Sequence, residues 1–166
     1  MARNFVSAVA AAMIVAWFGL PAHAKYAATD TIGDWVVYCD SEDADKCLAN
    51  QTIWMVQDDV RQKVVSSSVS RNDESWQMAL TLPMGVNLPF GAILRVDQGP
   101  QFKAPYLRCD TSGCVVLVDL NDELYDALKK GNTLTVGFKS SLSEQPLAVK
   151  LSLQGFTKAT GRLVTQ

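Results

Sequence analysis

The chain contains 166 residues, of which 48% are hydrophobic and 19% charged, and its formal net charge is −2. This length suits one domain, and the composition permits a packed core, which argues against global disorder and excludes collagen-like and coiled-coil architectures. The balance of 15 basic and 17 acidic side chains gives no electrostatic indication of nucleic-acid binding.

The first 24 residues have the pattern of a secretory signal peptide. Arg3 supplies a positive start, residues 5–20 are uncharged and largely apolar, and Ala22-His23-Ala24 fits the small-x-small motif that a signal peptidase reads. We predict cleavage after Ala24 and no membrane span after processing; a retained anchor is the alternative, although the apolar stretch is short for a bilayer-crossing helix. Cleavage removes the only histidine, so the mature chain cannot form a Ser-His-Asp or Cys-His catalytic site or a metal site with a histidine ligand.

The predicted mature chain starts with several strand-like runs. Residues 25–32 are expected to be a loose lead-in, and the runs 35–39 and 47–56 contain many aromatic and β-branched residues. The run 61–71 includes three consecutive serines, which favours an edge strand with one hydrated face. From Trp76 to Leu82 the residues alternate with the period of two that is typical of a half-buried strand.

The segment 82–91 contains two Pro-x-Gly units and is therefore predicted to be a structured crossing between strands. Its residues Met84, Val86, Asn87 and Phe90 form a candidate contact surface, because apolar side chains in a turn-rich segment mark partner contacts when they are exposed. Packing of this segment over one end of the fold is the favoured alternative.

One helix is predicted over residues 121–130. Asn121 supplies an N-cap, Asp122 and Glu123 favour the positive end of the helix, and Lys129-Lys130 favour the negative end before Gly131 terminates it. About eight strands with this one short helix predict an all-β fold, an antiparallel β-sandwich or flattened barrel, in a single domain of residues 25–166. The remaining strand-like runs are 92–96, 102–109, 114–120, 133–138 and 149–156.

Four cysteines remain in the predicted mature chain: Cys39, Cys47, Cys109 and Cys114. An even number in an exported domain indicates disulfides, because the compartments outside the cytoplasm are oxidising. Three connectivities exist, and the short polar turns favour Cys39–Cys47 with Cys109–Cys114. The spacings match zinc-thiolate motifs poorly and lack the C-x-x-C of redox enzymes, so we expect structural bridges, no metal and no cofactor.

Two further ligand sites are weaker alternatives. The acidic turn with Asp40, Glu42, Asp43 and Asp45 could bind calcium, but its spacing departs from that of an EF-hand loop, which favours a solvated hairpin tip. The tryptophans could form a sugar-stacking platform, yet large aromatic side chains mostly fill cores, and we assign them to the core. They are Trp35, Trp54 and Trp76.

A series of short motifs, in a specific order, resembles the invasion-associated locus B family over residues 33–159. The resemblance implies an exported bacterial protein of the periplasm or outer membrane, a role in host-cell entry for the founding member, and no family-wide catalytic residue or cofactor. The motifs are Gly33-Asp34-Trp35-x-Val37-x-Cys39, Cys47-x-x-x-Gln51, Leu82-Pro83-x-Gly85-Val86 with Leu88-Pro89, Cys109-x-x-x-Gly113-Cys114, the 120–131 helix, and Leu151-Ser152-Leu153-x-Gly155-Phe156-x-x-Ala159.

We therefore predict a non-enzymatic protein that binds an unknown protein or glycan at the cell envelope and contributes to host-cell invasion or envelope function. The predicted location is the periplasm, with outer-membrane association or secretion as alternatives. Two other hypotheses remain: a periplasmic thiol–disulfide enzyme that uses Cys109 and Cys114, and an envelope-assembly protein in which the crossing near Phe90 docks a partner chain.

Overall fold

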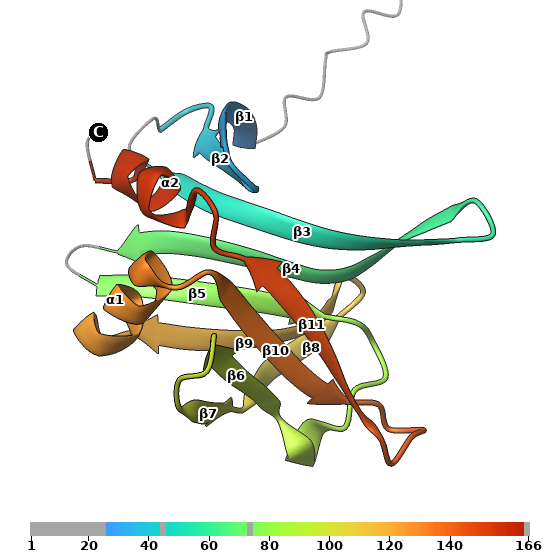
Figure 1. Cartoon of the computed structure of the whole chain (residues 1–166). Coiled ribbons are helices and arrows are strands. Elements are labelled where there is room, and N and C mark those ends of the chain that lie inside the picture. Colours follow the sequence, from blue (N-terminus) through green and yellow to red (C-terminus); the bar gives the residue numbers. More distant parts are fainter. Residues whose placement is uncertain (1–25, 44–45, 73–74, 165–166) are drawn as a thin grey trace, which may run out of the picture.

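The chain forms two antiparallel sheets that face each other, as the computed structural model in Figure 1 shows. The structure describes residues 26–43, 46–72 and 75–164; the predicted signal peptide, its cleavage site at Ala24, and Asp45 lie outside them. The strand order is β1-β2-β3-β4-β5-β9-β8 in the larger sheet and β11-β10-β6-β7 in the smaller one. The predicted fold class, an antiparallel β-sandwich with two disulfides, is confirmed.

The described residues contain eleven strands and two α-helices, which is more than the sequence indicated. The strands of the larger sheet are β1 (Tyr26–Ile32), β2 (Trp35–Asp40), β3 (Cys47–Gln57), β4 (Val60–Asn72), β5 (Ser75–Leu82), β8 (Tyr106–Asp110) and β9 (Gly113–Leu120). Those of the smaller sheet are β6 (Ala92–Val96), β7 (Gln101–Ala104), β10 (Thr133–Lys139) and β11 (Pro146–Ser152). The helices are α1 (Asp122–Lys130), α2 (Phe156–Arg162) and the short 3-10 turn η1 (Leu88–Phe90).

The core lies between the two sheets and follows the alternation of each strand. In β10, Leu134, Val136 and Phe138 are buried, whereas the residues between them are partly exposed. β5 buries Met78, Leu80 and Leu82 in the same way, as the alternation in the sequence predicted.

Both helices lie at one end of the sandwich (Figure 1). The predicted helix is confirmed as α1: the Asn121 side chain accepts a hydrogen bond from the backbone N–H of Leu124, and the helix ends at Gly131. Helix α2 was not predicted. The predicted strand 149–156 is wrong at its end, because Gly155, with φ of 91°, turns the chain so that Phe156 starts a helix.

The two disulfides are confirmed as Cys39–Cys47 and Cys109–Cys114. In each, the two cysteines are direct partners in the register of neighbouring strands, β2 with β3 and β8 with β9. Each bridge therefore covalently links adjacent strands next to a short turn, as the turn sequences indicated.

Three local predictions were wrong. β4 is not an edge strand but lies between β3 and β5. The serine run fits there because the side-chain N–H groups of Asn50 on β3 donate to Ser66 Oγ, Ser67 O and Ser68 Oγ at 2.9–3.0 Å; the Ser67 hydroxyl is buried without a partner among the described residues. The lead-in forms strand β1, at the sheet edge. The run 102–109 is two strands, since the chain passes at Pro105 from the smaller sheet to the larger.

A polar clamp joins the two sheets near the helical end. Gln51 on β3 is buried; its Nε2 donates to Asp34 O and to Ser152 O at 3.1 and 3.0 Å, and its Oε1 accepts from the backbone N–H of Ser152 at 2.9 Å. Trp35 Nε1 also donates to Ser152 O. Gln51 thus acts as a strand partner for the end of β11, which connects the smaller sheet to the larger.

Candidate functional site

The hairpin of β3 and β4 extends beyond the rest of the larger sheet (Figure 1). Its distal part, which we call the arm, comprises residues 54–62, and all nine are exposed. The turn at its tip consists of Asp58 and Asp59, whose φ angles of 50° and 61° are left-handed, as a two-residue hairpin turn requires. The arm is therefore a two-stranded ribbon without a hydrophobic core of its own.

The arm nevertheless carries large apolar side chains. Trp54 is 44% exposed, and Val56 and Val60 are 68% and 66% exposed. The guanidinium of Arg61 lies over the Trp54 ring at 4.3 Å, a cation–π contact at the surface. The assignment of Trp54 to the core was wrong, because its segment of β3 lies beyond the facing sheet.

The crossing between β5 and β6 packs over the sandwich at the same end as the arm. Val86 is buried and forms an isolated β-bridge with Ser140, whereas Met84 is 61% exposed. Asn87 caps the 3-10 turn η1 by accepting from the backbone N–H of Phe90 at 3.1 Å, and Phe90 itself is half-buried. Of the four predicted contact residues, Met84 offers the most apolar surface.

The arm, the crossing and the β10–β11 turn all carry exposed apolar side chains, and we call this region the apolar end. Strand alternation places Trp54 and Val56 on one face of the arm and Met55 on the other, which faces the crossing. Met55, Met84 and Leu147 line one hollow of about 240 Å³, and Ser141 in the turn donates to Gly85 O at 2.8 and 2.9 Å through its N–H and hydroxyl. The exposed residues of the apolar end are Trp54, Met55, Val56, Val60, Met84, Leu88, Leu142 and Leu147.

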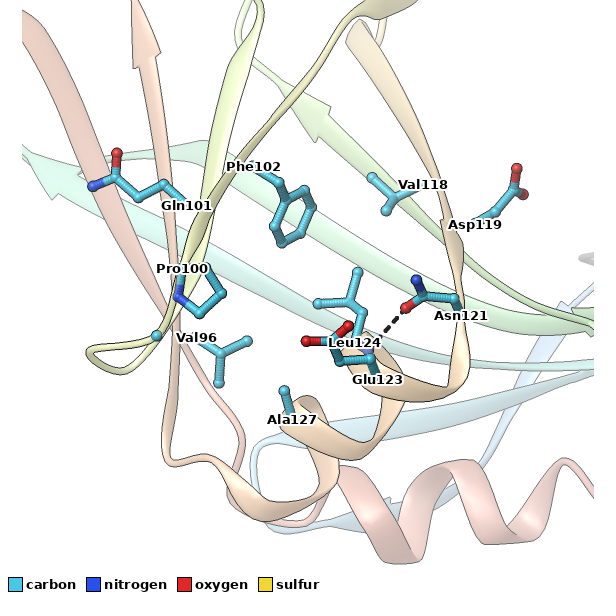
Figure 2. Close-up of a pocket in the computed structure, with 11 residues that line it drawn as sticks. Val96, Pro100, Gln101, Phe102, Val118, Asp119, Asn121, Glu123, Leu124 and Ala127 are labelled. Atoms are coloured by element: carbon cyan, nitrogen blue, oxygen red, sulfur yellow. Dashed lines mark hydrogen bonds between the residues drawn. The ribbon is translucent and has the colours of Figure 1, made fainter.

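A second hollow, of about 420 Å³, opens between β7 and the β9–α1 connection (Figure 2). Phe102, Val118 and Leu124 point toward this space, whereas Asp119 and Gln101 point away from it. The hollow is therefore an apolar opening at the edge of the core. Two of its polar neighbours are already engaged: Asn121 caps α1, and Asp119 accepts from Gln77 Nε2 at 2.9 Å.

Among the described residues, neither of the two weaker ligand sites assembles. Trp35 is fully buried against Phe156, and Trp76 stacks on Tyr125 with ring centroids 4.7 Å apart, so neither joins Trp54 in a surface platform. In the described part of the acidic turn, Asp40 accepts from the backbone N–H of Glu42, and Asp43 pairs with Lys46. Across the described residues, no group of three or more His, Cys, Asp or Glu is placed to hold a metal ion.

The surroundings of the second disulfide offer no feature of a reactive thiol. The described residues contain no free cysteine. The backbone N–H of Ser112 and the side chain of Arg108 lower the pKa of the neighbouring Asp110 carboxyl. These contacts stabilise the turn between β8 and β9 and do not involve the cysteines. Burial raises the pKa of Tyr106 to about 12, and its buried hydroxyl has no hydrogen-bond partner among the described residues.

The arm was not predicted from the sequence, although the unequal lengths of neighbouring strands indicate it. β4 has 13 residues, whereas its neighbour β5 has 8. A strand that is much longer than its neighbour must project beyond it, and the two aspartates at 58–59 mark where the projecting hairpin turns.

Two packed antiparallel sheets and two cross-strand disulfides define a disulfide-linked β-sandwich with exposed apolar side chains at one end. The model of the "Invasion associated locus B (IalB) protein" family matches residues 35–163, and the chain belongs to this family. The resemblance inferred from the sequence motifs is thus confirmed.

Two types of relatives support this assignment. An "Invasion protein B homolog" of Brucella abortus strain 2308 is 30% identical over 137 residues, which cover 81% of this chain and 78% of that protein. The crystal structure of invasion associated protein b from Bartonella henselae matches with a TM-score of 0.73 and 27% identity, over 83% of this chain and 96% of that chain. In the described residues, no helix is long and apolar enough to span a membrane.

Proposed function

We propose that this chain is an exported, non-enzymatic protein of the cell envelope that binds another protein through its apolar end. The observation that carries this proposal is the arm: a two-stranded ribbon, exposed over nine residues, that presents Trp54, Met55, Val56 and Val60 to solvent. A ribbon of this kind gains little from burial within its own chain, so a partner that covers these side chains would supply the missing apolar contact.

Three observations support export and a binding role. The chain starts with a signal-peptide pattern, its cysteines form disulfides, and both named relatives are described as invasion proteins. We propose the periplasm or the outer surface as its location, and a contribution to host-cell contact where the bacterium has a host. The mature chain, residues 25–166, is proposed to act as a single domain.

The predicted crossing residues enter this proposal as the base of the docking surface. Met84 lies beside Met55 in the same hollow, so a partner on the arm also reaches the crossing. Val86, Asn87 and Phe90 are proposed to hold the crossing in place: Val86 through its burial, and Asn87 through its cap on Phe90. The thiol–disulfide alternative gains no support from the second disulfide or from the relatives.

Co-purification from the native envelope tests this function. The double variant Val56→Asp/Val60→Asp places two charges on the arm and should fold normally, because both side chains are about two-thirds exposed. Its matched control is Leu107→Asp/Val164→Asp, which adds the same charge at exposed apolar residues outside the apolar end. We expect a discrete partner to be lost at least tenfold with the arm variant and retained with the control; equal recovery with both variants contradicts the proposal.

A further inference from the structure

The outer face of the smaller sheet differs from the rest of this acidic chain. The residues that alternate with the buried ones on β6, β7, β10 and β11 point outward, and register places Lys150, Thr135, Arg95 and Gln101 in one row across the four strands. Every ionisable residue on this face is a cation: Arg95, Lys103, Lys139 and Lys150. Neither α-helix covers the face, since both lie at the end of the sandwich (Figure 1).

A groove of about 320 Å³ crosses this face. Ile93, Thr135 and Ala148 contribute to its lining, and Gly137 lies among them without a side chain. Half-buried Phe90 and the exposed Pro146 also line the groove, together with Arg95, Gln101 and Leu147. Because Gly137 pairs with both Ile93 and Ala148, the absence of its side chain leaves space in the middle of the sheet.

The cations around this groove are only partly neutralised. Lys139 pairs with Glu144 at 2.6 Å, and Lys103 donates to Pro89 O at 3.1 Å. Arg95 and Lys150 have no ion pair with any described residue, and the Nε of Arg95 is buried without a hydrogen-bond partner there. An anion bound at the exposed part of the Arg95 guanidinium group would supply the counter-charge that no described residue provides.

We propose that this groove binds an acidic glycan, a sugar chain whose rings carry carboxylate or sulfate groups. Arg95 and Lys150 attract the anionic groups, Thr135 and Gln101 offer hydrogen bonds to sugar hydroxyls, and Phe90 offers an aromatic surface for a ring. The groove favours a chain over an anionic membrane, because a lipid surface is recognised by protruding apolar side chains, and these lie on the arm instead.

Binding of the full mature protein to an immobilised heparin oligosaccharide tests this site, with neutral dextran as the control ligand. The variant Arg95→Gln/Lys150→Gln should bind heparin about tenfold more weakly, since it removes two charge-assisted contacts. The matched control, Lys130→Gln/Lys158→Gln, removes the same charge from exposed positions on the helices and should change binding less than about twofold. An equal loss in both variants indicates unspecific ionic attraction and overturns the proposal.

A second variant separates the groove from its charge. A Cβ at Gly137 would approach Ile93 Cβ at 3.5 Å, an ordinary contact, so Gly137→Phe is sterically allowed at its first atom and extends a ring into the groove. We expect at least a threefold loss of heparin binding, with thermal stability and net charge unchanged. If a stable Gly137→Phe variant binds heparin as well as the unsubstituted protein does, the proposed site is wrong. The site is also wrong if Arg95→Gln/Lys150→Gln weakens binding to phosphatidylserine vesicles but leaves heparin binding unchanged.

Discussion

The polar clamp at Gln51 makes a quantitative prediction about how the two sheets are held together. Replacing Gln51 with methionine keeps the side-chain length but removes three hydrogen bonds, which join β3 to Asp34 O and to both backbone groups of Ser152. Each such bond contributes about 1 kcal/mol, and the buried backbone N–H of Ser152 loses the side-chain oxygen that satisfies it. We therefore expect the free energy of unfolding to fall by about 3 kcal/mol.

Urea denaturation of the oxidised mature protein measures this loss. With a slope of about 2 kcal/mol per M, the unfolding midpoint should fall by about 1.5 M while the slope stays constant. Gln77→Met is the matched control, because Gln77 makes a single surface hydrogen bond to Asp119 and its loss should cost less than about 1 kcal/mol. If Gln51→Met destabilises no more than Gln77→Met does, the clamp does not hold the sheets together.

Three further changes test individual features of the fold. Cys109→Ala/Cys114→Ala opens a loop with a sequence separation of 5 and should lower the free energy of unfolding by about 2 kcal/mol; an unchanged urea midpoint contradicts this. Asp58→Asn/Asp59→Gly should raise the free energy of unfolding by about 0.5–1 kcal/mol, because asparagine and glycine adopt the left-handed φ angles of this turn more readily than aspartate does. A lower urea midpoint would be evidence against the turn geometry. Burial raises the pKa of Tyr106 from 10.0 to about 12, so this residue stabilises the fold below pH 10 and loses that contribution as the pH rises toward 12. In urea titrations at increasing pH, Tyr106→Phe should therefore lose less stability between pH 10 and 12 than the unsubstituted protein does. An identical loss in both proteins refutes the role given to Tyr106.

Much of the fold could be predicted from local sequence patterns. The alternation in β5, the caps of α1 and the short turns between paired cysteines each arise from contacts within a few residues, so the sequence indicates them directly. The features that escaped prediction depend on distant residues. Three serines indicated an edge strand because the sequence does not show that Asn50, on the neighbouring strand, donates to the hydroxyls of Ser66 and Ser68 and to the backbone oxygen of Ser67.

The candidate site was predicted only at its base. The Pro-x-Gly units identified the crossing and hence Met84, because these residues determine local backbone geometry. The arm was missed because exposure depends on where the facing sheet ends, and an apolar residue such as Trp54 has the same local pattern inside and outside a core. The basic face was missed for a similar reason: Arg95 and Lys150 are far apart in sequence and share a row only through strand pairing.

Site-specific photo-crosslinking in the native bacterium tests the central claim, docking through the arm, most directly. A photoreactive amino acid at position 56 should give one discrete covalent adduct with an envelope protein, because Val56 is 68% exposed on the arm. The same group at position 107, an exposed apolar position on β8, should give no such adduct. Adducts of equal yield and identity at both positions, or none at position 56 in protein that is exported and oxidised, would contradict docking through the arm.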